Sequence, residues 1–466
     1  MKKPCRKGSI SILVLVFGVT ISAAIGGLVL VAATLFTAAT RTESFERALT
    51  IAQSGAEYYR WHLAHNPVDF KDGTNVPGPY VHQISDPYGG TEGTFSLTIT
   101  PPVSGSSIIT ITSTGWLTSH PDIKRTVKAR YGIPSIAKYA FLQNANVWYG
   151  SKTTINGRVF SNGGIRMDGD NTSTVQSAKQ TYTCGTETGC DPTATKPGVW
   201  GDGGPQSLWQ FPVPSVDFQG IALDFTTLKT AAQQSGVYLG SSGSYGYHVV
   251  FNANGTYTIT KIINADKEKG YSVESDCQSL YQTITQEQAV GTYSVADKPI
   301  IFAEDNIWVD GTVNGRAAVV AAKFPLDINA MNIWITNNIM YAAKDGLSGL
   351  GIIAQNNIYL GLHVPEILEV DAALLAQKGN VIRHNYKYQG CSHLPNAVRQ
   401  QLNVYGSLIS NLKSYWTWGT GTSGYGSDPV SGFSHVNITY DPALYYTPPP
   451  YFPNQGAYEF ISWEEQ

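Results

Sequence analysis

The hydrophobic and polar positions divide the chain into a helical first part and a β-rich remainder. No residue from 9 to 40 is charged, and most of these positions are apolar. Apolar positions at helical spacing then continue among charged residues as far as Asn66-Pro67, where the residue before proline disfavours helix. At about 1.5 Å per residue, the uncharged part alone exceeds the ~30 Å hydrocarbon core of a bilayer. The pattern therefore predicts one helix over 9–65, apolar first and amphipathic afterwards.

Beyond this helix, the pattern changes to the alternation that is typical of strands. Residues 94–100 and 107–114 alternate apolar side chains with Thr or Ser, which is the two-residue period of a half-buried strand. Pro101-Pro102 begins the turn between them. Further strands at 115–117 and 125–131 complete a small antiparallel β-meander, which we place within a head at 66–135.

A weak repeat runs through residues 136–440. Short apolar strands begin at Ile307, Ile333, Ile358 and Val381, so they recur about every 23–26 residues, and each follows an Asn. One such rung cannot bury its apolar side alone, and the repeat therefore predicts a stacked, right-handed β-helix-like solenoid. The Asn residues are expected to close turns rather than to form a side-chain ladder.

Two segments depart from the repeat. Residues 205–300 contain a helical stretch and a hairpin, so we expect an α+β insertion in the solenoid or a lateral subdomain. Residues 441–466 form a tail rich in Pro and aromatic residues. The predicted fold class is α+β, with a long N-terminal helix, a small antiparallel β head and a mainly-β solenoid.

The amino-acid composition excludes two classes of protein. Only 14% of residues are charged, and a hydrophobic content of 42% with 11% aromatic residues excludes a disordered chain. The net charge of −3 lacks the basic footprint of a nucleic-acid-binding protein, so no nucleic-acid partner is predicted. Low charge together with 47 Gly suggests a β-rich surface protein.

Positive charge is concentrated immediately before the apolar segment, at Lys2, Lys3, Arg6 and Lys7. Basic residues that precede a membrane span place the N-terminus in the cytoplasm. The chain is therefore predicted to be a single-pass protein of the cytoplasmic membrane. A secretory signal peptide fits less well, since its apolar region is only about 7–15 residues long. A plain signal-anchor stays an alternative.

The junction Lys7-Gly8-Ser9 resembles the type III leader of type IV prepilins, and residues 41–48 and 52–58 are similar to the helix that follows in PilX-type minor pilins. The resemblance implies that prepilin peptidase cuts between Gly8 and Ser9, leaving 1–8 as a leader, and that the new N-terminus is methylated. It also implies that the helix contacts other pilins and the inner-membrane assembly platform. The assembled protein would then lie in an extracellular filament or at the cell surface.

Leu13 departs from the pattern of the major pilins, which carry Glu at this fifth mature position. In that family the Glu meets the amine of a neighbouring subunit, and an unpaired carboxylate in lipid is costly. Its absence resembles K-type pseudopilins and implies a position at or near a filament tip. The predicted function is a non-enzymatic minor pilin that displays its solenoid for adhesion or assembly priming.

Five Cys are present, of which Cys5 lies in the leader. Cleavage of the leader would leave four Cys, and an even number of Cys in an extracytoplasmic chain favours disulfides. Cys184 and Cys190 can close a small local loop, which leaves Cys277 and Cys391 for a long-range bridge. The CxxC spacing that zinc sites prefer is absent, and no metal or cofactor is predicted.

Acidic residues give weaker candidates. Residues 168–171 lack the final Glu of an EF-hand loop, so an ordinary turn is favoured over a looser calcium site. Asp305, Asp310 and Asp327 are carboxylates of the kind that a β-helical polysaccharide lyase or hydrolase needs, but nothing pairs two of them and no catalytic residue is predicted. The alternatives are a membrane-anchored polysaccharide-degrading enzyme and a non-polymerising surface adhesin.

Tyr415, Trp416 and Trp418 form the most binding-like stretch, followed by a Gly/Ser/Thr loop at 419–424. Aromatic side chains beside such a loop suit stacking on sugars or on partner surfaces, so a carbohydrate or surface ligand is a candidate partner. Packing of these rings onto the end of the solenoid is an equal alternative.

A short basic face is predicted on the strand near 125–131. Lys124, Arg125, Lys128 and Arg130 alternate along it. Contacts with phosphate, lipid headgroups or neighbouring pilins are conceivable, and a solvated strand face is the default interpretation.

Overall fold

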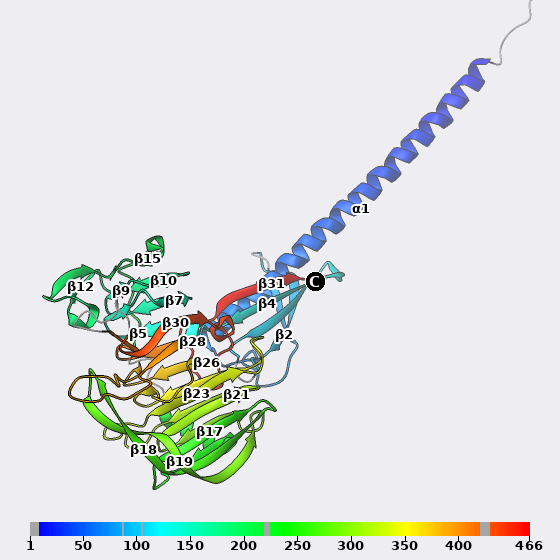
Figure 1. Ribbon diagram of the computed structural model, residues 1–466. Helices are drawn as coiled ribbons and strands as arrows, with labels where there is room; N and C mark the ends of the chain where they lie inside the picture. Colours follow the sequence, from blue (N-terminus) through cyan, green and yellow to red (C-terminus); the bar gives the residue numbers. More distant parts are fainter. Residues whose placement is uncertain (1–8, 86–87, 104–105, 219–223, 420–428) are drawn as a thin grey trace, which may run out of the picture. The chain divides into compact units, whose positions relative to one another are not determined.

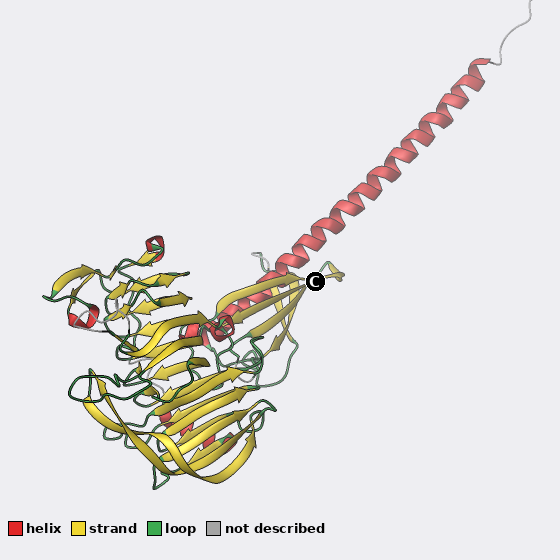
Figure 2. Ribbon diagram, viewed as in Figure 1, coloured by secondary structure: helices red, strands yellow, loops and turns green. Residues whose placement is uncertain are grey.

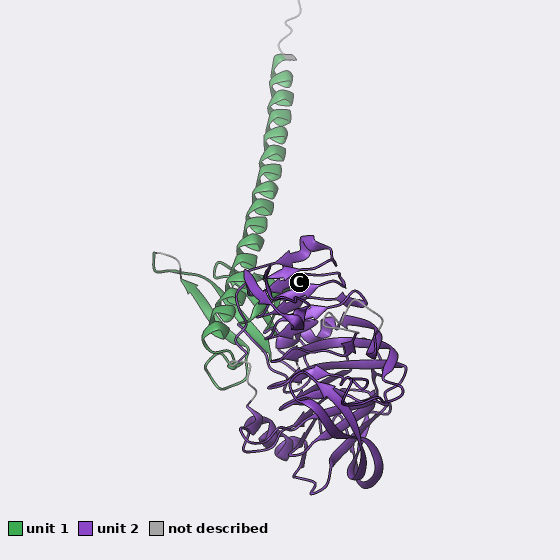
Figure 3. Cartoon of the chain, turned by 60° about the vertical axis from the view of Figure 1, so that its left-hand side comes forward, with its two compact units in different colours: residues 1–101, 109–132, 457–466 green, residues 102–108, 133–456 purple. Residues whose placement is uncertain are grey.

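The computed structural model describes residues 9–85, 88–103, 106–218, 224–419 and 429–466. These residues form two compact units (Figure 3). Unit 1 takes its residues from 1–101, 109–132 and 457–466, and unit 2 from 102–108 and 133–456. The chain contains one long helix, and the rest of it is almost entirely strand and loop (Figure 2). The fold class is α+β with a mostly-β body, as predicted.

Unit 1 consists of helix α1 (Ser9–His65) and a five-stranded sheet. The sheet is antiparallel, in the order β1 (Tyr80–Ser85), β2 (Thr91–Thr100), β3 (Ile109–Leu117), β4 (His120–Gly132) and β31 (Glu459–Glu465). The predicted strands at 94–100 and 125–131 are β2 and β4, and the two predicted at 107–114 and 115–117 are the single strand β3. Strand β1 was not predicted. The fifth comes from the C-terminal tail, where no strand was predicted.

The second half of α1 packs against this sheet. Its buried side chains recur at intervals of three to four residues: Ala48, Ile51, Ala52, Ala56, Tyr59 and Leu63. They join Phe95, Leu97 and Ile111 of the sheet in one apolar core. Gly115 in β3 permits the closest approach, because a Cβ atom there would lie 2.4 Å from the backbone nitrogen of Ala52.

The C-terminal strand supplies acidic partners to three of the four residues of the predicted basic face, and Lys124 stays exposed. Glu464 lies 3.4 Å from Arg130 and 3.9 Å from Lys128, and Glu465 contacts Arg125. These ion pairs follow from the antiparallel register that places β31 beside β4. The expectation of a simply solvated face is therefore wrong: its acidic partners lie more than 300 residues away in the sequence.

Unit 2 is built mainly from short parallel strands that lie side by side (Figure 1). One continuous series runs, in spatial order, through β16 (Val237–Leu239), β20 (Ile300–Ala303), β22 (Arg316–Ala321), β24 (Gly349–Ala354), β26 (Ile367–Ala376), β28 (Val398–Ser410), β5 (Phe141–Gln143), β8 (Val159–Ser161), β11 (Val175–Ser177) and β15 (Trp209–Gln210). Each strand pairs in parallel with the next. The interior is filled by Ile, Val, Leu and Ala.

Spatial order and chain order differ in this series. The chain begins in the middle, at β5, and runs outward to β15. It then crosses to the other end, at β16, and returns strand by strand until β28 pairs with β5. Residues 205–300 thus supply both end strands of the parallel stack, β15 and β16, as well as a lateral hairpin.

A second series carries the repeat that is visible in the sequence. It contains β17 (Gly246–Asn252), β21 (Ile307–Val313), β23 (Ile333–Tyr341), β25 (Ile358–Leu360) and β27 (Val381–Ile382). Ile307, Ile333, Ile358 and Val381 are successive register partners. The spacing of the repeat therefore gives the register of these strands correctly.

The Asn residues before these strands form a ladder, and the expectation of turn closure alone is wrong. The side-chain oxygen of Asn306 accepts the backbone N–H of Asn332 at 2.9 Å. Asn332 accepts that of Asn357 at 3.1 Å, and Asn357 accepts that of Asn380 at 3.0 Å. Each side chain thus satisfies a backbone donor of the next strand, which stabilises the stacking.

In a third series of parallel strands, β28 pairs with β30 (Ser431–Tyr440), β30 with β7 (Thr153–Asn156), and β7 with β10 (Asp170–Asn171). Smaller elements complete unit 2: the parallel strands β6 (Val147–Tyr149), β9 (Ile165–Met167) and β14 (Val199–Trp200), the antiparallel pair β12 (Thr181–Cys184) and β13 (Ala194–Pro197), β29 (Thr417–Trp418) beside β30, and α2 (Phe225–Ser235).

A long antiparallel hairpin, β18 (Thr256–Ser272) and β19 (Asp276–Ser294), pairs with β17. It covers a column of stacked rings, in which the centroids of Trp308 and Trp334 lie 6.1 Å apart and those of Trp334 and Tyr359 lie 4.4 Å apart. The backbone carbonyl of Gln282 accepts the indole N–H of Trp308 at 2.9 Å. The hairpin thus buries a row of aromatic side chains that would otherwise face solvent.

His248 forms part of the attachment of the hairpin. Its two ring nitrogens lie 2.7 Å from Glu287 of β19 and 3.0 Å from Asp310 of β21. Burial alone would lower the pKa of His248, but the hydrogen bonds and charges of the two carboxylates outweigh it, so that the pKa is raised. The imidazole therefore links the hairpin to the parallel stack.

Candidate functional site

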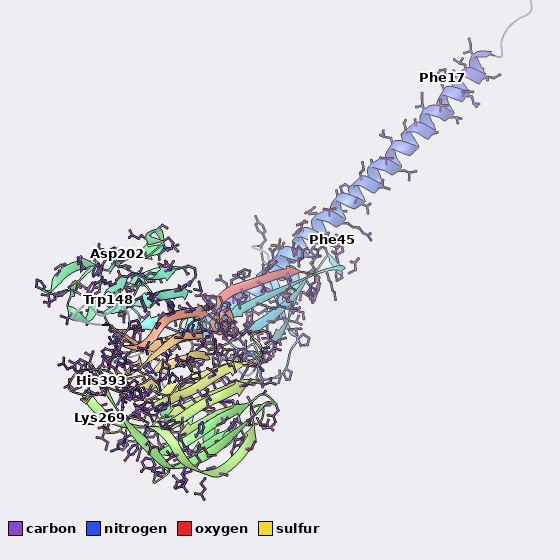
Figure 4. All side chains as sticks on the ribbon, viewed as in Figure 1. Phe17, Phe45, Trp148, Asp202, Lys269 and His393 are labelled. Atoms are coloured by element: carbon purple, nitrogen blue, oxygen red, sulfur yellow. A yellow bond between two sulfur atoms is a disulfide. The ribbon has the colours of Figure 1, made fainter. Side chains whose placement is uncertain are left out.

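The first half of α1 is an apolar surface that no other described part of the chain covers. The large apolar side chains from Ile10 to Phe36 are exposed, and Phe17 projects from the helix with 59% of its surface accessible (Figure 4). The helix is long and apolar enough to cross a membrane, with a mean hydropathy of 2.5 in its most apolar window. Because an apolar surface of this size is unfavourable in water, it requires lipid or other helices.

The four threonine hydroxyl groups on this half of the helix are satisfied internally. Thr20, Thr34, Thr37 and Thr40 each donate to a backbone carbonyl three or four residues earlier, at distances from 2.8 to 3.1 Å. A polar group in hydrocarbon must find its hydrogen bond within the protein. The segment therefore presents no unsatisfied hydroxyl donor to lipid at these positions.

Charged residues mark the end of the apolar surface. Arg41 is the first charged residue after the described start of the helix, and Glu43 lies 3.8 Å from Arg47 on the same face. Leu13 is 58% exposed and supplies no carboxylate within the apolar half. The predicted cleavage residue Gly8 and the leader residues Lys2, Lys3, Arg6 and Lys7 lie outside the described residues, and Ser9 is the first residue of α1.

The predicted aromatic stretch divides between two environments in unit 2. Trp416 is 6% exposed and belongs to the interior, where its ring stacks on Phe141 with centroids 5.9 Å apart. Tyr415 is also buried, at 4% exposure, but it lies in the wall of a cavity of about 540 Å³. Trp418, which is partly exposed, lines the same cavity, with its ring edge to face with Tyr415 at 5.0 Å. Residues 420–424 of the predicted loop lie outside the described residues.

A third ring, Trp148, which is 6% exposed, completes the aromatic lining of this cavity, which we call the aromatic pocket. The indole N–H of Trp148 donates to Asp168 at 2.7 Å, and the guanidinium of Arg166 lies 4.0 Å from the ring centroid. Asp168 also accepts from Arg166 at 2.8 Å. The candidate calcium residue Asp168 therefore orients Trp148 and Arg166.

Both disulfides hold walls of the aromatic pocket. The four predicted Cys form the bridges Cys184–Cys190 and Cys277–Cys391. The first closes the short loop that carries Thr186 and Glu187, and the second fixes the base of the turn that carries Val273 and Glu274. These two segments and residues 412–419 come from distant parts of the chain, and the bridges keep two of the three in place.

Polar groups line the pocket among the rings. Glu274 accepts the hydroxyl of Tyr415, and it accepts the side-chain amide of Asn380 at 3.2 Å. Glu187 accepts the backbone N–H of Gly185 at 3.3 Å. Lys413 donates to the backbone carbonyl of Glu187, and burial lowers the pKa of Lys413 to about 8. The pocket therefore offers acceptors and a donor beside three aromatic rings.

The candidate carboxylates of a polysaccharide-degrading enzyme have separate roles. Asp305 accepts the backbone N–H and the hydroxyl of Ser242, at 2.8 and 2.7 Å, and Asp310 accepts from His248. Asp327 is exposed in a loop. Among the described residues, no group of three or more His, Cys, Asp or Glu side chains could hold a metal ion.

No protein-family model matches the sequence, and no curated protein matches it significantly. Among solved structures, the chain is similar to the competence-associated pilin ComZ from Thermus thermophilus. The sequences are 15% identical, the alignment covers 91% of this chain and 97% of that chain, and the TM-score is 0.29. A TM-score this low assigns neither fold nor family, so the function must be argued from the residues of the chain itself.

Proposed function

We propose that the protein is a non-enzymatic, pilin-like subunit that is anchored in the cytoplasmic membrane before assembly and that then displays unit 2 on a filament. The observation that carries this proposal is the division of α1. One half is apolar and exposed, whereas the other half is packed on an antiparallel sheet. A helix built in this way can exchange lipid for the helices of other subunits while its folded unit stays intact.

The leader supplies the second argument. Gly8 and Ser9 stand between four basic residues and the apolar helix, where prepilin peptidase would cut and methylate. Its products would be a free Ser9 amine at the start of α1 and a mature helix without the basic residues. Other pilins, the peptidase and the inner-membrane assembly platform are thus the proposed partners.

Leu13 supports a place at or near the filament tip. A subunit in the shaft gains from a carboxylate that meets the amine of its neighbour, because the pair compensates for the loss of water. A subunit with no neighbour ahead of it has no such amine, and an apolar residue avoids a buried, unpaired charge. Adhesion or assembly priming by unit 2 suits such a place.

The N-terminus of the mature chain tests the proposal. The full chain is expressed with its peptidase, and the N-terminal peptide is identified by mass spectrometry. Methylated Ser9 is the expected result, with Gly8→Arg as the control that blocks cleavage. An intact Met1 on the wild-type chain refutes the pilin assignment and leaves an anchored adhesin. Immunogold labelling of unit 2 should mark filament ends, and labelling along the whole shaft would refute the tip position.

A further inference from the structure

We infer that the aromatic pocket of unit 2 binds a neutral carbohydrate, by stacking one pyranose ring on its aromatic lining. The pocket lies wholly within unit 2 and does not depend on the membrane helix. Its volume of about 540 Å³ lies within the range of roughly 300–1,000 Å³ that is usual for small-molecule sites. Carbohydrate binding would be what unit 2 contributes when it is displayed, and only this use of the pocket rests on the proposed function.

The rings provide the first half of the recognition. Trp418 is partly exposed, and its orientation is fixed because its indole N–H donates to the carbonyl of Arg383 at 2.9 Å. Tyr415 is 4% exposed and supports Trp418 from beneath by an edge-to-face contact, so Trp418 is the ring that presents its face to a ligand. Rings that are already oriented lose little conformational entropy when a ligand stacks on them. The C–H face of a pyranose suits such a surface, since aromatic rings offer both area and a negative face.

The polar groups provide the second half. A carboxylate has about four lone-pair sites, and Glu187 and Glu274 are both exposed. The hydrogen bonds described above leave each of them able to accept from sugar hydroxyls. The ammonium of Lys413 supplies a donor on the same wall. Hydroxyl groups both donate and accept, so a sugar can use acceptors and donors that lie side by side.

The charges select among other ligand classes. Two carboxylates disfavour an anionic ligand such as a nucleic acid, a sulfated glycan or a sialylated glycan, because like charges repel at short range. The ammonium of Lys413 offsets part of this negative charge, which weakens the attraction for a cationic amine. A purely apolar ligand would leave the carboxylates desolvated without partners, which is costly. A neutral polyhydroxyl compound meets none of these penalties.

Binding is tested with the full chain in a detergent that has no sugar head group. The chain is applied to an array that presents neutral hexose and N-acetylhexosamine oligosaccharides, sialylated and sulfated glycans, and amino sugars. Selective binding of neutral glycans is the expected result. Preference for anionic or amino-sugar glycans overturns the inference, and so does the absence of any binding.

Variants then place the ligand in the pocket. Glu187→Gln keeps the shape of an exposed side chain and removes one charged acceptor, and the affinity for the best neutral glycan should fall about tenfold or more, as expected for a charge-assisted hydrogen bond. Trp418→Ala should weaken binding at least as much. The matched controls are Asp327→Asn, which removes an exposed carboxylate elsewhere, and Tyr451→Ala, which removes a ring that is 38% exposed. Both should bind within about twofold of wild type.

The Glu187→Gln variant decides the case if Trp418→Ala fails to fold, because its exposed side chain is not part of a core. Wild-type affinity in Glu187→Gln refutes the pocket. Failure of this inference is distinguishable from failure of the proposed function. A chain with methylated Ser9 that binds no glycan refutes only the ligand, whereas a chain with intact Met1 that binds neutral glycans refutes only the pilin assignment.

Discussion

Gly115 provides the sharpest test of how α1 is held in unit 1. In Gly115→Ala, the new Cβ atom would lie 2.4 Å from the nitrogen of Ala52, 2.6 Å from the oxygen of Ala48 and 2.9 Å from the Cα of Ala52. Ordinary carbon contacts lie at about 3.5–4.0 Å, so the helix must move away by about 1 Å. All three obstructing atoms belong to backbone, and no rotamer change relieves them. Overpacking typically costs about 1–3 kcal/mol, and we expect a value near 3 kcal/mol here.

Hydrogen exchange of the full chain in detergent measures this effect. Peptides that cover the buried half of α1 should exchange about a hundredfold faster in Gly115→Ala than in wild type, which corresponds to about 3 kcal/mol. Peptides of unit 2 should be unaffected. Gly27→Ala is the matched control, because no atom lies within 4 Å of the added Cβ on the exposed half of the helix. Exchange in Gly115→Ala within threefold of wild type would show that the helix is not packed on β3 as described.

Three further predictions concern the stability of unit 2. Cys277→Ser opens a loop with a sequence separation of 114 and should lower the free energy of unfolding by about 4.8 kcal/mol. Cys184→Ser opens a loop with a separation of only 6 and should lower it by about 2.4 kcal/mol. Equal urea midpoints for the two variants would contradict this. The folded-state pKa of His248 is raised, so its contribution to stability is complete below the unfolded pKa near 6.5 and is lost as pH rises through the folded pKa. The difference in unfolding free energy between wild type and His248→Gln should therefore shrink as pH rises above about 6.5. A difference that grows with pH would refute the carboxylate contacts. Asn332→Ala leaves a backbone N–H of the next rung without its acceptor and should cost about 1–3 kcal/mol in urea unfolding, and a cost below 0.5 kcal/mol would argue against the ladder.

The sequence pattern was sufficient to predict those features that depend on residues close together in the chain or on a regular repeat. Helix α1 has the predicted limits, because its hydropathy and the Asn66-Pro67 stop both act within a few residues. The register of Ile307, Ile333 and Ile358 was predictable because equivalent residues stack on each other in a parallel series.

Long-range pairing was not predictable. Strand β31 belongs to unit 1 only because Glu459 is in register with Gly132, and no local feature of the tail announces that partner. The spatial order of the stack has the same cause. Nothing in residues 141–143 states that they pair with 408–410 rather than with a strand nearer in the chain.

The candidate site shows the same division. The aromatic stretch was visible in the sequence, but the sequence did not separate Trp416, which packs inward, from Trp418, which lines the pocket. No local feature marks Glu187 and Glu274 as neighbours of these rings, since they lie far from the rings in the chain. The Cys pairs were the available signal, because each bridge lies next to one of these two residues.

The connectivity of unit 1 bears on how a displayed unit is attached. The chain leaves β4 at Gly132 and re-enters the same sheet at Glu459, and these two residues are register partners in neighbouring strands. Unit 2 is therefore inserted into the sheet that packs on α1 rather than added to the end of the chain. Both of its ends continue into hydrogen-bonded strands, one of which carries the ion pairs of Glu464 and Glu465. A load on this segment would thus be shared by two adjacent strands, which is what the proposed display of unit 2 requires.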